Sequence, residues 1–326
     1  MTMLNKEKFL TPFLNKNISI GIKGIAAIMV MLGHFTSDFP WYISMLFPGQ
    51  CWVGIFFFYS GFGLQFKVNC QTFNWYYLIR KIKNILVPFW IAESLYTVSY
   101  IFLEHKQSIF EILLGCAGLK LYNTVLWYVI ELVMLYILFF ILTKFQITLI
   151  IWIPLYFLWL IVSVIFDIGT WWYISTSTFI FGIFYAKFFT TRKFFEKYNI
   201  KLLKVAKGTV IIWIICYLLR GWISSNSMLF SSIRVGYVLT ALDMIIIPLF
   251  VIVIAFLSKI FKKVLYNQWC CVLGNISYTV YLYHMLVYLW IKSFFGNNVF
   301  TIFISTILTF MIGIGNYYIR QKYNYK

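Results

Sequence analysis

Apolar runs of about twenty residues, each bounded by charged or turn residues, recur along the whole chain. A helix needs about 20 apolar residues to cross the hydrocarbon core of a bilayer. The pattern therefore predicts an all-α fold, a polytopic bundle of about ten transmembrane helices. Because the pattern continues from end to end, we expect a single transmembrane domain over residues 1–326, without a separate soluble domain. The predicted spans are 18–35, 44–66, 84–103, 123–143, 147–166, 171–189, 209–223, 235–257, 272–291 and 299–319.

The composition excludes an ordinary water-soluble domain. Of the 326 residues, 62% are hydrophobic and 11% are charged, whereas soluble domains carry about 25% charged residues. None of the six cysteines lies at a metal-ligand spacing, so we expect no metal site.

The net charge of +18 raises the question of a nucleic-acid partner. The basic residues, however, fall in short clusters between apolar runs, as the positive-inside rule predicts for cytoplasmic loops. With the N-terminus inside, 22 Lys and Arg lie on the inner side and 5 on the outer side. We therefore expect membrane lipids as partners, no nucleic acid, and both termini in the cytoplasm. The bias toward Ile, Lys, Asn and Phe is typical of an AT-rich bacterium. Together with the apolar runs, it predicts a multi-pass protein of the bacterial plasma membrane.

The first apolar run carries a cation at one end and an imidazole at the other. Ten residues separate Lys23 from His34, so a helix holds them roughly 16 Å apart, about half the depth of the hydrocarbon core. An ionisable group at such a depth is a candidate functional residue; the alternative is a histidine at the headgroup level. Asp38 follows His34 by four residues and could orient its ring as that of a general base, or it is a solvated loop residue. We assign no role to His105, in a predicted outer loop.

Ionisable residues also interrupt later apolar runs. His284 lies in the middle of a predicted span, among tyrosines, and such a residue faces the bundle interior. Glu131 lies four residues after Trp127 and shares its helix face. Glu93 and Asp243 are further acids within apolar runs.

Two other stretches combine polar and apolar residues. The glycines of Gly54–Leu64, among phenylalanines, favour close helix packing, and Ser60 lacks the GxSxG elbow of a nucleophile. Arg80, Lys81 and Lys83 lie just before a predicted helix start. There they would meet anionic headgroups or a phosphorylated cytosolic ligand.

Together these stretches resemble the acyltransferase-3 family of integral-membrane acyltransferases, which includes O-acetyltransferases of bacterial surface polysaccharides. The first helix matches a basic residue followed after ten residues by histidine, Lys23 and His34. Phe56–Phe62 is similar to the family's FFxxSGF, and Ser277–His284 to its SYxxYLxH. A basic cluster before a proline and the LWY at Leu126 fit as well. The motifs occur in the family's order and cover most of the chain.

Two positions depart from the family pattern. The family usually has arginine where this chain has Lys23, and a further arginine where Asn84 stands. A lysine keeps the charge but loses the bidentate fork that suits a phosphate. Donor binding is therefore expected to differ in its contacts.

The resemblance implies a membrane O-acyltransferase that moves an acetyl group from cytosolic acetyl-CoA to a hydroxyl of a cell-surface or lipid-linked glycan. No permanently bound cofactor is implied, and His34 would act as general base or as acyl carrier. The implied donor-binding residues are Lys23, Arg80, Lys81 and Lys83, and the candidate catalytic residues are His34, Asp38, Glu131 and His284.

Two alternatives stay open at this point. A transporter or flippase without acyl-transfer chemistry would also have many helices and buried polar residues, although transporters often show inverted repeats and none is evident in this sequence. An acyltransferase of the same family with a small-molecule acceptor would share the histidine and differ in its acceptor pocket.

Overall fold

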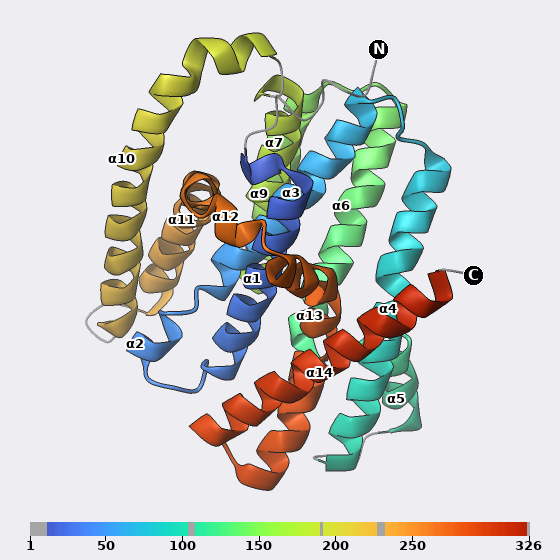
Figure 1. The fold of residues 1–326 in the computed structure, drawn as a ribbon. Helices are drawn as coiled ribbons and strands as arrows, with labels where there is room; N and C mark the ends of the chain where they lie inside the picture. The colour runs from blue at the N-terminus through green and yellow to red at the C-terminus, as the bar shows by residue number, and fades with distance from the viewer. Residues whose placement is uncertain (1–11, 104–107, 190–191, 227–231, 325–326) are drawn as a thin grey trace. The chain divides into compact units, whose positions relative to one another are not determined.

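A computed structural model of the chain describes residues 12–103, 108–189, 192–226 and 232–324. Throughout these ranges the regular structure is helical, with no strand (Figure 1). Eight of the described helices are long and apolar enough to cross a membrane. The prediction of an all-α polytopic membrane protein is therefore confirmed, while the cytoplasmic position of both termini stays a prediction. His105 lies outside the described residues.

The eight long helices coincide with eight of the ten predicted spans, and the other two spans are also helical but shorter. Over 147–166 the apolar helix covers Leu149–Ile165. Over 171–189 the helix is interrupted at Ser175 and ends in a π-helical turn, Tyr185–Phe189. Run length in the sequence overestimated the length of both helices, and over 171–189 it did not register the break at Ser175.

The chain divides into two compact units, each made of discontinuous segments. Unit 1 comprises Met1–Ala26, Phe39–Phe73 and Thr148–Gly274. Its elements are η2 (Pro12–Leu14), the first part of α1 (Lys16–Phe35), α2 (Trp41–Ser44), α3 (Gly49–Asn69), η4 (Leu149–Ile151), α7 (Trp152–Ile165), α8 (Trp171–Ile174), α9 (Thr176–Phe184), η5 (Tyr185–Phe189), α10 (Arg192–Ser225), α11 (Ser232–Ile260), α12 (Lys262–Leu265) and the start of α13 (Gln268–Phe295).

Helices α3 and α9 of unit 1 pack backbone against backbone. A Cβ atom at Gly61 would overlap the carbonyl of Phe179, and one at Gly182 would overlap the carbonyl of Phe58. Small residues allow this approach, which drives helix association in membranes through van der Waals contact. The packing role predicted for Gly54–Leu64 is therefore confirmed.

Unit 2 comprises Ala27–Asp38, Asn74–Ile147 and Asn275–Lys326. Its elements are the last part of α1, α4 (Trp75–Leu103), α5 (Ile109–Cys116), η3 (Thr124–Leu126), α6 (Trp127–Lys144), most of α13 and α14 (Val299–Asn324). The candidate chemistry of the sequence is concentrated in this unit.

Helix α4 begins earlier than the apolar run predicts. The Asn74 side chain caps its first turn, with its Oδ1 accepting from the Tyr77 backbone N–H at 2.9 Å. The basic cluster predicted just before the helix therefore lies inside it, in its second and third turns. The prediction was wrong because the cap, and not the first apolar residue, determines where the helix starts.

Candidate active site

Two of the predicted site residues, 250 positions apart in the chain, meet in unit 2. The imidazole rings of His34 and His284 stack, with centroids 5.4 Å apart and planes at 27°. His284 is fully buried, whereas His34 is half-buried. His34 is thus the more accessible member of the pair.

The hydrogen bonds of His284 define its tautomer. Its Nδ1 lies 2.7 Å from the carbonyl oxygen of Tyr281 and 3.2 Å from that of Val280. A carbonyl oxygen only accepts, so Nδ1 carries a proton, and in the neutral imidazole Nε2 then carries a lone pair. Among the described residues Nε2 has no hydrogen-bond partner. The ring can therefore accept a proton or a hydrogen bond at Nε2.

The helices that carry the two histidines also touch through glycines. Within unit 1, a Cβ atom on Gly24 of α1 would lie 2.7 Å from the backbone nitrogen of Gly274 of α13. Each histidine follows its glycine by ten residues, so the interval is the same on both helices. This matched Gly-to-His interval is a signal in the sequence that motif reading missed.

Asp38 does not take the position that its spacing from His34 predicts. Helix α1 ends at Phe35, so the i, i+4 geometry that would aim Asp38 at the His34 ring is lost. Its Oδ2 instead accepts from Lys292 Nζ at 3.0 Å and from Asn297 Nδ2 at 3.1 Å. The orienting role predicted for Asp38 therefore has no support in the contacts of this carboxylate. Lys292 and Asn297 were not singled out in the sequence.

The basic cluster is divided between two faces of α4. Lys81 Nζ lies over the rings of Tyr136, at 4.9 Å, and Tyr77, at 5.9 Å. Arg80 and Lys83, one and two positions away, are exposed. At 3.6 residues per turn Arg80 and Lys83 share a face that Lys81 does not. In unit 2 the exposed pair is therefore the part of the predicted cluster that can meet an anion, and Lys81 makes cation–π contacts.

Lys23, the fourth predicted donor-binding residue, lies in unit 1. Its Nζ is 5.2 Å from the centroid of the Tyr59 ring. The Tyr59 hydroxyl donates to the carbonyl of Phe13 at 2.9 Å. Tyr59, a residue of the FFxxSGF-like motif, thus makes a cation–π contact with Lys23.

Glu131 is buried in α6, with 4% of its surface exposed, and Trp127 on the same face is 6% exposed. The shared face predicted from their spacing is therefore a buried one. The assignment of Glu131 as a catalytic residue stays a prediction.

A second buried carboxyl group belongs to Glu93 of α4, which is fully buried. Its Oε1 accepts from the backbone N–H groups of Tyr122, at 2.7 Å, and Asn123, at 3.3 Å. Among the described residues, Glu93 Oε2, Thr97 Oγ1, the Tyr122 hydroxyl and Asn123 Nδ2 are buried polar atoms without a hydrogen-bond partner. The sequence showed Glu93 only as an acid in an apolar run; its partners come from a loop that no motif marks.

Glu93 lies near the level of His284 along the helices of unit 2. Near one end, the Tyr278 hydroxyl donates to the carbonyl of Ile85 at 2.6 Å. Toward the other end, the rings of Phe102 and Trp290 lie 6.0 Å apart. On α13, His284 lies midway between Tyr278 and Trp290. On α4, the midpoint between Ile85 and Phe102 is close to Glu93. The buried polar group around Glu93 is therefore near the depth of the histidine pair.

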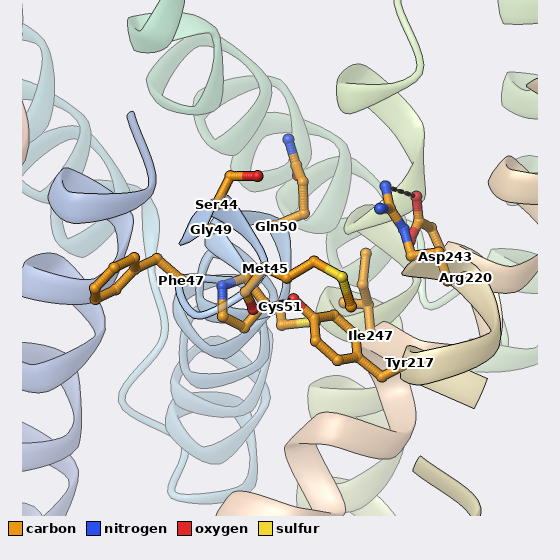
Figure 2. A pocket seen from close by; sticks show the side chains of 11 residues that line it. Ser44, Met45, Phe47, Gly49, Gln50, Cys51, Tyr217, Arg220, Asp243 and Ile247 are labelled. Carbon is orange, nitrogen blue, oxygen red and sulfur yellow. Dashed lines mark hydrogen bonds and ion pairs between the residues drawn. The ribbon is translucent and has the colours of Figure 1, made fainter. Parts of the chain in front are cut away.

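Unit 1 contains a separate cavity of about 180 Å³, shown in Figure 2. Arg220 of α10 and Asp243 of α11 form a bidentate ion pair on its wall, with Nη2 2.9 Å from Oδ2. The Tyr217 hydroxyl donates to the carbonyl of Met45 at 2.6 Å. Arg220 is one of the five Lys and Arg residues that the sequence assigns to the outer side, and in the structure it lies within α10, opposite an acid. The pair joins two helices that lie side by side (Figure 1).

The fold and these contacts define a polytopic all-α membrane protein with a stacked histidine pair among its helices. A family model described as an acyltransferase domain matches residues 18–316. The chain belongs to the acyltransferase-3 family, and it is a membrane acyltransferase. No curated protein and no solved structure matches the chain.

Proposed function

We propose that the protein transfers an acetyl group from cytosolic acetyl-CoA to a hydroxyl of a cell-surface or lipid-linked glycan, in the bacterial plasma membrane. The observation that carries the proposal is the stacked pair of His34 and His284 in a chain of the acyltransferase-3 family. Buried ionisable residues are rare in membrane helices and mark functional sites. The family membership argues against a transporter without acyl-transfer chemistry.

His34 is the residue that we assign to the reaction, because it is the accessible ring of the pair. As general base, it takes the proton of the acceptor hydroxyl while the oxygen attacks the thioester carbonyl. The new C–O bond forms, the C–S bond breaks, and the CoA thiolate leaves and takes up the proton. As acyl carrier, a His34 nitrogen attacks the thioester first, the C–S bond breaks and the CoA thiolate leaves. The acceptor oxygen then attacks the acetyl-imidazole, the C–N bond breaks, and the imidazole of His34 is released.

His284 supports either route. Its Nδ1–H is engaged by backbone carbonyls, so the ring presents a neutral, unprotonated Nε2 within the buried part of the site. In the first route it accepts a hydrogen bond or shares the proton that His34 takes up. In the second route it serves as the base for the acceptor hydroxyl.

The donor would be held through its phosphates by cations of the predicted inner side. Arg80 and Lys83 are exposed on one face of α4, where polyanionic CoA can reach them. Lys81, whose Nζ makes cation–π contacts with Tyr136 and Tyr77, adds positive charge to the same helix. Lys23, in unit 1, stays a separate candidate for a phosphate contact, with the weaker phosphate geometry of lysine.

The test is transfer of labelled acetyl groups from acetyl-CoA to envelope glycan, in membranes with matched amounts of wild type, His34→Ala or His105→Ala. His105 is the remaining histidine of the chain, so its variant controls for the loss of an imidazole as such. We expect His34→Ala alone to abolish transfer. Full transfer by His34→Ala would contradict the assignment. Transfer only to small alcohols would favour a small-molecule acceptor.

Base and carrier routes are separated by the half-reaction. Wild type is mixed with acetyl-CoA without acceptor, quenched within seconds and digested for mass spectrometry. An acetyl group on the peptide that contains His34 supports the carrier route. Its absence, together with normal transfer when acceptor is added, supports the general base.

A further inference from the structure

Four polar side chains of unit 2 form one hydrogen-bonded group, which we call the polar rim: Asp38, Tyr288, Lys292 and Asn297. Asp38 Oδ2 accepts from Lys292 Nζ at 3.0 Å and from Asn297 Nδ2 at 3.1 Å. Asn297 Oδ1 in turn accepts from the Tyr288 hydroxyl at 2.9 Å. Lys292 Nζ also lies 5.7 Å from the centroid of the Tyr288 ring. The group joins the segment after α1 to the end of α13 and the turn that follows it.

The polar rim lies close to the histidine pair, about one helical turn further along each chain segment. Asp38 follows His34 by four residues, and Tyr288 follows His284 by four. Phe35 links the two layers, because its ring stacks on Tyr288 at 4.6 Å and lies 5.9 Å from the His284 ring. A molecule bound at the polar rim would therefore have a part of itself close to the histidines.

Three of the four side chains of the polar rim are accessible. The side chains of Asp38 and Lys292 are 50% and 41% exposed, and Asn297 is exposed. Tyr288, by contrast, is 5% exposed and anchors the group. A carboxylate offers about four lone-pair positions. Asp38 uses two of them for Lys292 and Asn297, and its Oδ1 accepts a longer hydrogen bond from the Ser37 hydroxyl at 3.4 Å.

The chemistry of the polar rim differs from that of the cations on α4. It contains one acid, one base, one amide and one phenol, so its formal charge is balanced. A group without net positive charge does not favour the binding of a polyanion such as CoA. Sugar hydroxyls, which both donate and accept hydrogen bonds, match a surface that presents acceptors and donors side by side.

We propose that the polar rim binds the acceptor, through the hydroxyls of a neutral saccharide ring adjacent to the hydroxyl that is acylated. This inference rests on the proposed glycan O-acetyltransferase function and names the residues that select its acceptor. Asp38 thus contacts substrate and does not orient His34. Asn297 places its amide beside the carboxylate, and Tyr288 holds the amide in position.

The test measures acceptor and donor kinetics separately, with the full chain in lipid nanodiscs. The acceptor probe is the envelope polysaccharide of the producing cell, stripped of O-acetyl groups with mild base, and the donor is labelled acetyl-CoA. The variants are Asp38→Asn and Asn297→Ala. Glu111→Gln is the matched control, because Glu111 forms a similarly exposed ion pair with Lys120 at 2.8 Å in the same unit.

We expect each rim variant to raise the KM for polysaccharide about tenfold, as the loss of a hydrogen bond to a charged or amide group does. The KM for acetyl-CoA should not follow, and Glu111→Gln should behave as wild type. Asp38→Glu, which keeps the carboxylate, should restore part of the acceptor affinity.

Three outcomes would overturn the inference. Unchanged polysaccharide KM in both rim variants would remove the binding role. A parallel rise of both KM values, or a fall in thermal stability absent from Glu111→Gln, would show that the group only stabilises the fold. Failure of wild type to acetylate any polysaccharide, with acetyl-CoA still consumed on another acceptor, would reject the proposed function and the inference with it.

Discussion

His34 and His284 lie ring on ring, 5.4 Å between centroids, and only the second is fully buried. The buried ring is fixed by backbone carbonyls one turn before it, so it cannot swing away without leaving its Nδ1–H unpaired. The accessible ring has no such tether in the described contacts. A rigid, buried imidazole thus stacks on a more exposed one, which fits a pair in which His284 handles a proton and His34 meets the substrates.

The first prediction concerns the Nε2 atom of His284. His284→Phe keeps a ring of similar shape for stacking on His34 but removes the acceptor nitrogen. If the nitrogen takes part in proton transfer, kcat should fall by roughly 100-fold or more, the range of general acid–base contributions. Acetyl transfer by purified protein at saturating acetyl-CoA measures the change. Activity near that of wild type would leave His284 with a packing role only.

The second prediction concerns the exposed cations of α4. Arg80→Ala and Lys83→Ala should each raise the KM for acetyl-CoA about fivefold, since a cation near a phosphate-rich surface contributes about 1 kcal/mol. The effect should shrink at high salt, because exposed charges are screened. Lys144→Ala, an exposed lysine at the end of α6, is the control. Equal effects of all three variants would mean that only general surface charge matters.

The third prediction concerns the glycine contact between α1 and α13. Gly24→Ala would place a Cβ atom 2.7 Å from the backbone nitrogen of Gly274, which cannot give way as a flexible side chain can. We expect a loss of about 1–3 kcal/mol in stability, typical of overpacking. Gly63→Ala is the control, because a Cβ at Gly63 meets nothing within 4 Å. Thermal unfolding in detergent compares them, and equal melting temperatures would contradict the close contact.

The fourth prediction concerns the clamp that Glu93 forms on the loop before α6. Glu93→Ala removes the acceptor for two backbone N–H groups and should destabilise the protein by about 1–3 kcal/mol, the range for an orphaned buried donor. Glu93→Gln keeps an acceptor oxygen and should be milder. Protection of the Tyr122 and Asn123 amides from hydrogen exchange provides a local measurement. Unchanged protection in the alanine variant would show that the loop is held by other contacts.

The fifth prediction concerns the ion pair on the wall of the unit 1 cavity. A double-mutant cycle with Arg220→Met and Asp243→Leu should give a coupling energy of about 1–3 kcal/mol, as expected for contacting residues in one network. The exposed Lys120–Glu111 pair should give less than about 1 kcal/mol in the same cycle. If the two cycles agree, partial burial adds nothing to the Arg220–Asp243 interaction.

The sequence alone was sufficient for the class of protein, because the length of an apolar run and the cost of leaving a backbone group unpaired in lipid are local properties. The family followed from Lys23, His34 and the motif that ends at His284, whose order along the chain can be read without coordinates. Helix starts were less certain. The assumption that α4 begins with its apolar run placed its start too late, because the polar side chain of Asn74 caps the helix earlier.

Tertiary structure alone decided which residues meet. His34 and His284 both stood out in the sequence, yet their stacking depends on how α1 and α13 pack in unit 2. Asp38 turned to Lys292 and Asn297 because α1 ended three residues before it. In lipid the apolar faces of helices are nearly equivalent, so partners are selected by small residues and polar contacts between distant segments. That selection is a property of the packed structure and cannot be read from run length or spacing.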